Sequence, residues 1–175
     1  MNVIARGTLP VMDPITIRRA RPADAEAIAV IYNQGIEDRL ATLETQTRTA
    51  EERRGWLVAR GPRHPVLVGE ANGRVVGWSS LNSFNPRPAY DHVADLSVYV
   101  ERGWRGRGVG RRLLEALVSC GRELDYHKLV LAAFPFNAAG VSLYGRVGFT
   151  EVGVYREQGR LDGKWVDVVV MEKLL

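Results

Sequence analysis

The chain has 175 residues, a net charge of +4, 46% apolar residues and 25% charged residues. At about 100–200 residues per domain, this length predicts one domain, and the composition excludes a disordered chain. No apolar run reaches the roughly 18 residues of a membrane span, and a single cysteine excludes a disulfide framework. The first residues lack the apolar stretch of about 7–15 residues that marks a secretory signal, so we expect a soluble cytoplasmic protein.

A flexible tail is expected over residues 1–13, followed by one domain over residues 14–175. In chain order the expected elements are a strand at 15–19, a helix from 21 to about 35, a helix from 49 to about 61, strands at 66–71, 74–80 and 93–100, a helix that follows segment 101–112, a strand at 128–134, a helix at 137–147, and strands at 150–160 and 164–174. Asn72-Gly73 is a strong hairpin turn, and Thr49 and Glu52 have the spacing of a capping box at the start of the second helix. Asn82–Asp91 contains two prolines and is expected to be a loop. This order predicts a mixed α/β fold with a largely antiparallel sheet flanked by helices.

A segment rich in glycine and arginine, Glu101–Arg112, follows the strand 93–100 and opens a helix. Its glycines let the backbone approach a ligand closely, and several N–H groups can then face one anion. The positive end of the helix dipole and the arginine side chains add to the attraction. The segment therefore predicts a site for phosphate or pyrophosphate, formed by Arg105, Gly106, Arg107, Gly108, Val109, Gly110 and Arg111.

Other interpretations of this segment have to be weighed. It lacks the Gly-Lys-Ser/Thr ending of a P-loop, and Arg111 stands where a dinucleotide fingerprint has its third glycine. An exposed loop without a ligand is one alternative, and a nucleic-acid contact is another because the chain is basic. The arginines gather in one segment instead of spreading over a face, which favours a local anion site and argues against a nucleic-acid partner.

Two motifs resemble those of the Gcn5-related N-acetyltransferase (GNAT) family. The motif Arg105-x-x-Gly108-x-Gly110 after a strand is similar to that family's loop for the pyrophosphate of acetyl-CoA. Segment 137–149 resembles its motif Asn-x-x-(Ser/Ala)-x-x-Leu-Tyr-x-x-x-Gly-Phe, with Gly140 where Ser or Ala is usual. The order of the elements also fits the family's fold. The resemblance implies an N-acetyltransferase that takes acetyl-CoA as a co-substrate.

Within the family, the chain is similar to the phosphinothricin and methionine sulfoximine acetyltransferases. The strand ending Ser97-Val98-Tyr99-Val100 and the tail motif Gly159-x-x-x-Gly163-Lys164-Trp165-x-Asp167 resemble theirs. Asn85-Pro86-Arg87-Pro88 resembles a neighbouring group associated with arsinothricin. The resemblance implies acetyl transfer to the amine of a small amino-acid-like substrate, by direct attack in a ternary complex, and it implies a homodimer.

The segment Glu101–Arg112 is called the anion loop below. The strand before it, 93–100, is expected to hold the pantetheine arm of the co-substrate. The backbone of Val98, Tyr99 and Val100 can pair with the arm's amides as with an added strand. The same alternation also suits a core strand, and both interpretations can hold at once. Asn137 is expected to bond the pantetheine or a nearby backbone group, and it is also a common helix N-cap.

Acetyl transfer needs a base for the ammonium group and an acid for the departing thiolate. Asp95 is the expected base, where the phosphinothricin group carries a Glu; the alternative is that it caps a turn or pairs with an arginine. Tyr144 is the expected acid, because the family places a Tyr or His there near the sulfur and a phenol with a pKa near 10 stays protonated. Its helical spacing also suits a position in the core.

The acceptor is expected under the loop 82–91. Arginine is the expected partner for a second acidic group on the substrate. Arg87 is available, although an ungapped match puts Asn85 where the methionine sulfoximine enzymes carry their arginine. Ser97, Tyr32 and Glu37 complete the expected substrate site.

Three other functions are weighed against this one. They are acetylation of a protein N-terminus or lysine, coenzyme A binding without catalysis, and nucleic-acid binding. The proline-containing loop suggests a lid over a small pocket, which favours a small-molecule acceptor. His92 and His127 have no partners at ligand spacing, so no metal site is expected, and Cys120 is expected to be packed and not nucleophilic.

Overall fold

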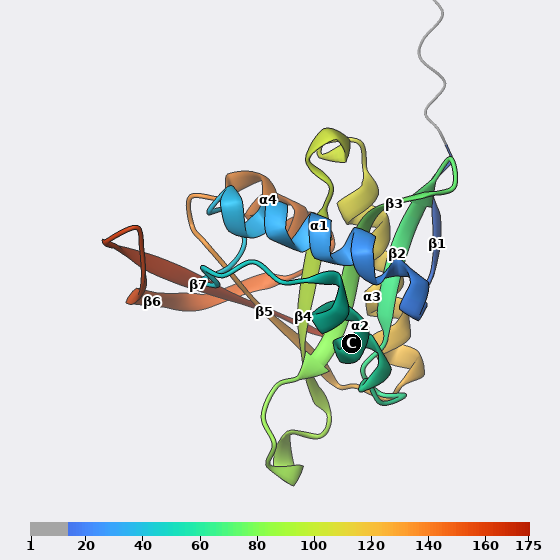
Figure 1. Cartoon of the computed structure of the whole chain (residues 1–175). Helices are drawn as coiled ribbons and strands as arrows, with labels where there is room; N and C mark the ends of the chain where they lie inside the picture. Colours follow the sequence, from blue (N-terminus) through green and yellow to red (C-terminus); the bar gives the residue numbers. More distant parts are fainter. Residues whose placement is uncertain (1–13) are drawn as a thin grey trace, which may run out of the picture.

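The computed structural model describes residues 14–175, so the tail expected at 1–13 lies outside the described residues. One seven-stranded sheet, in the order β1-β2-β3-β4-β5-β7-β6, carries helices on its faces (Figure 1). All neighbouring strands are antiparallel except β4 and β5, which are parallel. The expected mixed, largely antiparallel fold is confirmed. The strands are β1 (Thr16–Arg19), β2 (Val66–Ala71), β3 (Arg74–Ser83), β4 (Val93–Val100), β5 (Lys128–Ala133), β6 (Thr150–Leu161) and β7 (Lys164–Leu174).

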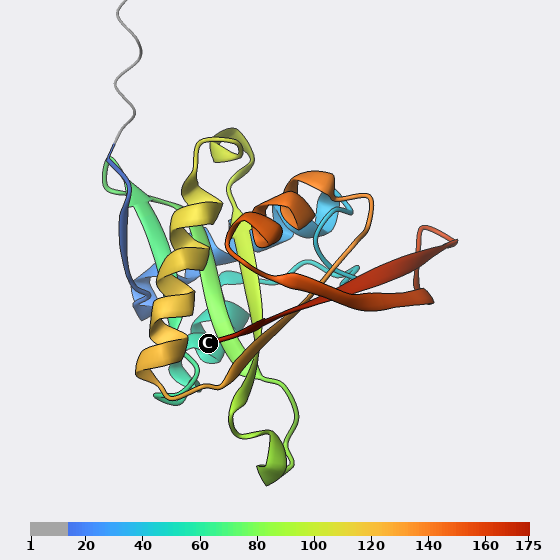
Figure 2. The same cartoon turned by 180° about the vertical axis from the view of Figure 1, so that it is seen from behind.

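Helices cover both faces of the sheet, as Figures 1 and 2 show from opposite sides. The pair α1 (Ala25–Glu37) and α2 (Ala50–Val58) lies on one face and α3 (Val109–Glu123) on the other, while α4 (Ala138–Arg146) packs at the first turn of α3. No helix within residues 14–175 has the length and apolar character needed to cross a membrane.

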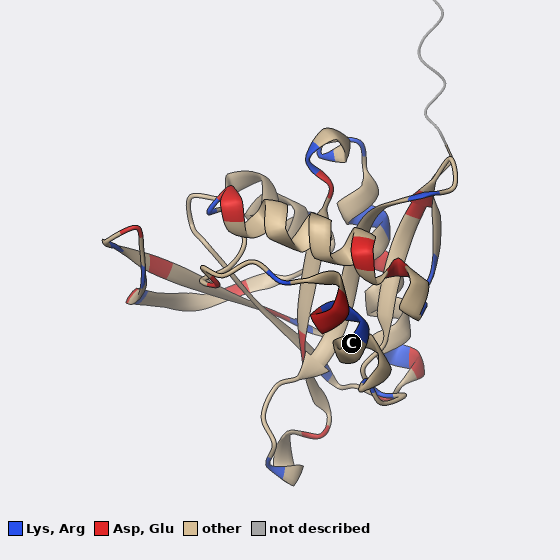
Figure 3. Cartoon of the chain, in the orientation of Figure 1, with Lys and Arg blue, Asp and Glu red and all other residues tan. Residues whose placement is uncertain are grey.

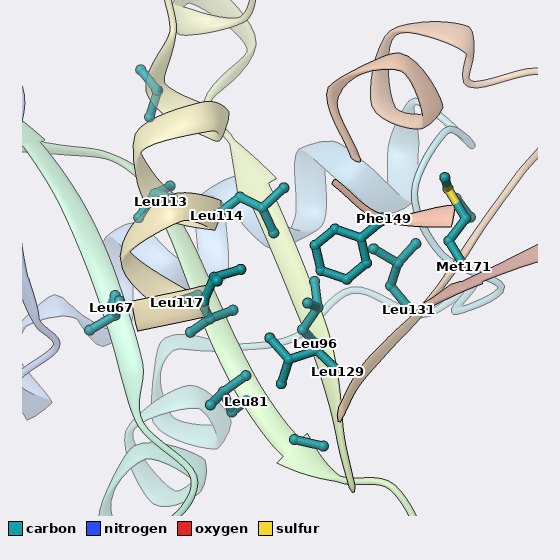
Figure 4. Packing of buried hydrophobic residues seen from close by; sticks show 14 of the residues in the cluster. Leu67, Leu81, Leu96, Leu113, Leu114, Leu117, Leu129, Leu131, Phe149 and Met171 are labelled. Carbon is teal, nitrogen blue, oxygen red and sulfur yellow. The ribbon is translucent and has the colours of Figure 1, made fainter. Parts of the chain in front are cut away.

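The sheet is buried on both sides because its central strands carry apolar residues at consecutive positions. On β2, Leu67 belongs to the cluster under α3, whereas its neighbours Val66 and Val68 pack under α1 and α2. The apolar stripe of α3, which includes Leu113 and Leu117, meets the sheet in the larger cluster (Figure 4). Burial of this kind contributes about 25 cal/mol per Å² of apolar surface.

Local signals set several element ends where the sequence predicts them. Thr49 Oγ1 accepts from the backbone N–H of Glu52, and the Glu52 carboxylate accepts from the backbone N–H of Thr49, which completes the expected capping box. Some boundaries differ. The α-helix α1 begins at Ala25, after a 3-10 turn over Pro22–Asp24, and α2 ends at Val58 instead of near residue 61. The strand β3 continues to Ser83 instead of ending near residue 80. Asn82 and Ser83 pair with Asp95 and Ala94 of β4, so the partner strand extends β3 into the expected loop.

Candidate active site

β4 and β5 separate halfway along β4. The parallel pairing joins Val93–Asp95 to residues 128–130 and then ends, while β4 stays paired with β3 as far as Val100. The two strands visibly diverge in Figures 1 and 2. Residues 96–100 of β4 therefore have a strand neighbour on one side only among the described residues.

The free edge of β4 belongs to the backbone of Val98 and Val100. The N–H of Glu101 donates to Val76 O at 2.9 Å, next to the pair Gly77–Val100. In an antiparallel ladder, alternate residues direct their backbone groups to the same neighbour. Glu101 and Tyr99 thus face β3, whereas Val98 and Val100 face the gap beside β5. This is the geometry that an amide-bearing chain needs in order to add to β4 as a further strand.

A cleft of about 330 Å³ lies where the strands diverge. Asp95 and Ser97 line it from β4, and they are the two expected site residues that the structure brings together there. The other walls come from the loop after α1, from the end of β5 and from the β6–β7 hairpin. The additional lining residues are Ala41, Thr42, Leu43, Leu96, Ala132, Ala133, Phe134, Tyr155, Gln158 and Val168.

Asp95 is a half-buried carboxylate at the point of divergence. Burial raises its pKa to about 6, and the hydrogen bonds from the Asn82 side chain and the Leu96 backbone oppose that rise. The carboxylate lies outside the ion pairs of the described chain, so it is not neutralised by an arginine. A carboxylate with this pKa is ionised at neutral pH and is a stronger base than an ordinary Asp.

Tyr144 lies on α4 and packs against the core cluster under α3, with its ring 6.2 Å from that of Phe149. Burial raises its pKa to about 12, and the charge of Asp95 adds to this effect. The two expected catalytic groups therefore interact electrostatically across the gap between β4 and α4. Tyr144 is not among the residues that line the cleft, so its expected role as the acid stays a prediction.

The loop between β4 and α3 leaves a row of backbone donors free. Gly106 and Gly108 have φ values of 75° and 81°, which residues with a side chain rarely adopt. Gly108 is the N-cap of α3, and within the described chain the N–H groups of residues 107–111 donate to no acceptor. Gly110 packs tightly, because a Cβ there would lie 3.1 Å from a Leu143 methyl group. The loop thus presents unpaired donors at the positive end of a helix, as an anion site requires.

The arginines of this loop divide into two groups, and Figure 3 shows how the basic positions gather here. Arg105 is held by Asp38 at 2.6 Å and donates to Val100 O at 3.3 Å. Arg111 pairs with Glu115 one turn along α3. The Arg107 guanidinium lies 5.1 Å from the Trp104 ring and has no acidic partner among the described residues, so it is the basic side chain most available to an anion.

Asn137 caps α4, as its residue type suggests. Its Oδ1 accepts from the Gly140 N–H at 3.1 Å, and its Nδ2 donates to Leu40 O at 3.1 Å. A Cβ on Gly140 would lie 2.7 Å from Asn137 Nδ2, which explains the glycine at a position where Ser or Ala is usual. Asn137 therefore ties the loop after α1 to α4; its expected bond to pantetheine stays a prediction.

Four expected substrate residues lie outside the cleft. Tyr32 packs among aromatic rings, 5.0 Å from Tyr99 and beneath the Arg53 guanidinium, and Glu37 pairs with Arg102. The other two belong to the loop between β3 and β4, which projects from the sheet in Figures 1 and 2. Of these, Asn85 lines a separate hollow and Arg87 is exposed.

Sequence reasoning missed Thr42, Leu43, Tyr155 and Gln158 of the cleft wall. The first two stand in a loop without a motif. The other two lie on the exposed strand β6, whose residues carry no periodic signal for a site. These four residues line the cleft because the loop after α1 and the strand β6 come together at the gap beside β4.

Comparison with known proteins identifies the class. The model of the Acetyltransferase (GNAT) family matches residues 31–149. The chain is 33% identical to the L-methionine sulfoximine/L-methionine sulfone acetyltransferase of Salmonella typhimurium, over 90% of this chain and 93% of that protein. A crystal structure of a ribosomal-protein-alanine N-acetyltransferase from Brucella melitensis is 38% identical, covers 91% of this chain and 99% of its own, and has a TM-score of 0.88.

A third similar structure contains the co-substrate. It is a GNAT superfamily phosphinothricin acetyltransferase from Sinorhizobium meliloti in complex with acetyl-CoA, which is 26% identical, covers 92% of this chain and 88% of its own, and has a TM-score of 0.87. The chain described here belongs to the acetyltransferase (GNAT) family and is an N-acetyltransferase. The resemblance found in its motifs is confirmed.

Proposed function

We propose that the chain, as one catalytic domain over residues 14–175, transfers the acetyl group of acetyl-CoA to the amine of a small amino-acid-like substrate. One observation carries the proposal: the free edge of β4 runs from the base Asp95 to the unpaired donors at the start of α3. An extended thioester co-substrate that pairs with this edge would place its anionic end at the loop and its acyl end beside the carboxylate. The relatives that act on phosphinothricin or methionine sulfoximine support the same acceptor class.

The residues divide the binding of acetyl-CoA between backbone and side chain. The N–H groups of residues 107–111 and the Arg107 side chain bind the pyrophosphate, as the free donors suggest. Val98 and Val100 pair with the amides of the pantetheine arm, while Tyr99 anchors β4 to β3 through its backbone and stacks on Trp78 at 4.7 Å. Val109 is buried beneath the loop and fixes the first turn of α3.

The chemical steps need one base and one acid. Asp95 takes a proton from the substrate ammonium group, and the free amine attacks the thioester carbonyl carbon. A backbone N–H of β4 stabilises the oxygen on which charge develops. The carbon–sulfur bond then breaks, Tyr144 donates its proton to the coenzyme A thiolate, and the products are the N-acetylated substrate and coenzyme A. No enzyme nucleophile takes part. Within residues 14–175 no group of three or more His, Cys, Asp or Glu side chains is arranged to hold a metal ion.

A second acceptor class is favoured by one finding. The similar structure from Brucella melitensis is named for acetylation of a ribosomal protein alanine, which is a peptide N-terminus. The cleft beside Asp95 is bounded by the loop after α1 and by the β6–β7 hairpin, and its volume of about 330 Å³ suits a single amino acid. A peptide could place only its N-terminal residue in the cleft, and the rest of its chain would have to extend past the exposed side of this hairpin.

An acetyl-CoA consumption assay over several acceptors tests the proposal. The panel contains phosphinothricin, methionine sulfoximine, arsinothricin, ordinary L-amino acids, and peptides with an N-terminal alanine. We expect turnover with at least one free amino acid or analogue, and none when Asp95→Asn replaces the wild-type chain. Turnover confined to the peptides would establish the second class, and no turnover with any amine would overturn the proposal.

The proposal includes a homodimer in the cytoplasm, without a nucleic-acid or membrane partner. The β6–β7 hairpin exposes apolar side chains, among them Val152 at 59% and Trp165 at 59%, in excess of what a solvated hairpin needs. The one cysteine, Cys120, is free, as is usual in a reducing compartment. Light scattering of the wild type and of Trp165→Arg tests the dimer: we expect twice the monomer mass for the first and a lower mass for the second.

A further inference from the structure

Asn82 lies between Asp95 and the half-buried guanidinium of Arg60. Asn82 and Asp95 are paired neighbours on β3 and β4. Asn82 Nδ2 donates to Asp95 Oδ2 and to Ser97 Oγ, each at 3.4 Å. Asn82 Oδ1 accepts from Arg60 Nη2 and from Ser80 Oγ, each at 3.1 Å. All the hydrogen-bonding positions of this one amide are therefore in use.

The guanidinium fixes which way the amide points. Arg60 has only donors, so it can face the oxygen of the Asn82 amide but not the nitrogen. Arg60 is itself held in place, because it donates to the backbone oxygens of His64 and Leu81 and lies 4.5 Å from the Trp56 ring. Every acceptor of Arg60 in the described chain is neutral. Its charge is thus not cancelled by an acid, and the amide nitrogen has to face β4.

We propose that Arg60 and Asn82 are positioning residues for the catalytic base: Arg60 fixes the amide of Asn82, and Asn82 holds the Asp95 carboxylate in its ionised form beside the cleft. This inference rests on the proposed function, in which Asp95 takes the proton of the acceptor. It adds two residues, Arg60 just after α2 and Asn82 on β3, that stand outside the recognised motifs and that touch neither the acceptor nor acetyl-CoA.

The other groups around Asp95 leave this role to Asn82. Val130, its neighbour on β5, is apolar. Tyr144 on α4 and Tyr155 on β6 are the phenols on that side, and Arg60, in the loop after α2, is the cation beyond the amide. Burial raises the pKa of Asp95 and the Asn82 bond lowers it. Without the Asn82 bond, only the Leu96 backbone hydrogen bond opposes burial, and the carboxylate stays protonated up to a higher pH.

The pH dependence of kcat/KM tests the role of Asn82. In Asn82→Leu we expect the acidic limb to move to higher pH by about half to one unit, so that the rate on that limb falls about three- to tenfold. The dissociation constant for acetyl-CoA should stay at the wild-type value, because Asn82 does not contact the anion loop. If a folded Asn82→Leu variant has the same acidic limb as the wild type, the inference is overturned. Asn82→Ser, which is too short to reach Asp95, repeats the test if the leucine variant does not fold.

A pair of arginine variants separates positioning from general stability. Arg60→Met should shift the same limb in the same direction, and it should add less to the shift in an Asn82→Leu background than it adds alone. Arg54→Met is the matched control, because Arg54 lies nearby on α2 with half its side chain exposed and its nearest acid, Glu51, 3.9 Å away. We expect the control to keep the wild-type profile. Equal shifts in Arg60→Met and Arg54→Met would contradict the inference.

A direct titration keeps the test independent of turnover. The ¹³C resonance of the Asp95 carboxyl group, assigned with Asp95→Asn, reports its pKa in wild type and in Asn82→Leu. We expect a higher pKa in the variant, whatever the acceptor is. Identical titrations would refute the positioning role even in an active enzyme, and a shift in a chain that acetylates no amine would refute only the proposed function.

Discussion

Asp38 Oδ2 lies 2.6 Å from Arg105 Nη1, so the end of α1 holds the loop that precedes α3. Asp38 Oδ1 also binds Arg102 at 2.7 Å, and Gln34, one turn earlier, accepts from the Arg102 backbone N–H. Arg102, followed by Arg105, holds the pKa of Asp38 below its usual range. These contacts join the end of α1 to the anion loop, about 65 residues further along the chain. They fix the position of the loop relative to α1.

Replacement of Asp38 by asparagine is expected to weaken acetyl-CoA binding. The loop would lose its anchor on α1, and we expect the dissociation constant to rise about two- to fivefold, the size of a partly exposed ion pair. Isothermal titration calorimetry measures this change. Glu37→Gln is the control, because Glu37 pairs with Arg102 alone at 3.2 Å. A tighter complex in Asp38→Asn would show instead that Asp38 competes with the pyrophosphate for Arg105.

A glycine substitution in the anion loop is expected to affect both stability and binding. Gly108 has φ 81°, where an alanine costs about 1 kcal/mol, so Gly108→Ala should lower the melting temperature by about 2–4 °C. A change in backbone conformation at residue 108 would also turn the N–H groups of the loop away from the bound anion, so acetyl-CoA binding should weaken. Gly163, in the β6–β7 turn, has the same φ of 81° and equal space around it, which makes Gly163→Ala a matched control. Equal losses of affinity in both variants would contradict a role for the loop in binding.

Much of the fold could be predicted because its signals are local. The Asn72-Gly73 turn and the capping box at Thr49 involve neighbours in sequence, and both are present in the structure. The end of β3 could not be predicted, because Ser83 stays in the sheet only where β4 pairs with it. Where pairing with another strand decides the end of a strand, the strand's own residues do not indicate that end.

The candidate site divides in the same way. Asp95 and Ser97 could be placed at the cleft because both lie on a recognisable strand that leads into the glycine-rich loop. Glu37 could not be placed, because its partner Arg102 is decided by how α1 packs on the sheet. Asn82 had no motif of its own. Its proposed role comes from the register of β3 and β4 and from the Arg60 guanidinium in the loop after α2.

The hydroxyl of Tyr144 is expected to carry the acid step. Tyr144→Phe keeps the packing against Phe149 but removes the proton for the thiolate, so kcat should fall at least about tenfold while acetyl-CoA binding is preserved. With a pKa of about 12, Tyr144 should give no basic limb in the ordinary assay range. Tyr90→Phe, on the projecting loop, is the control and should keep the wild-type kcat. A wild-type kcat in Tyr144→Phe would remove it from the mechanism.

The raised pKa of Asp95 predicts opposite effects on activity and stability. Activity should fall about tenfold per pH unit below about pH 6, where the base becomes protonated. The folded chain binds this proton up to about pH 6, whereas the unfolded chain releases it near about pH 4. The contribution to the free energy of unfolding is therefore complete below about pH 4 and is lost as the pH rises through about 6.

Asp95→Asn should abolish the activity, and it should also remove the decrease in the free energy of unfolding that the wild type shows as the pH rises through about 6. At about pH 7 we expect the variant to be more stable than the wild type by about 1–3 kcal/mol, because the wild type then carries a buried charge that asparagine lacks. The difference should vanish toward about pH 4, where both side chains are neutral. Urea unfolding at the two pH values measures it, with Asp91→Asn on the projecting loop as the control. A variant that is inactive yet no more stable at neutral pH would mean that Asp95 is not held in a charged, partly desolvated state, and the basis for its role as the base would be lost.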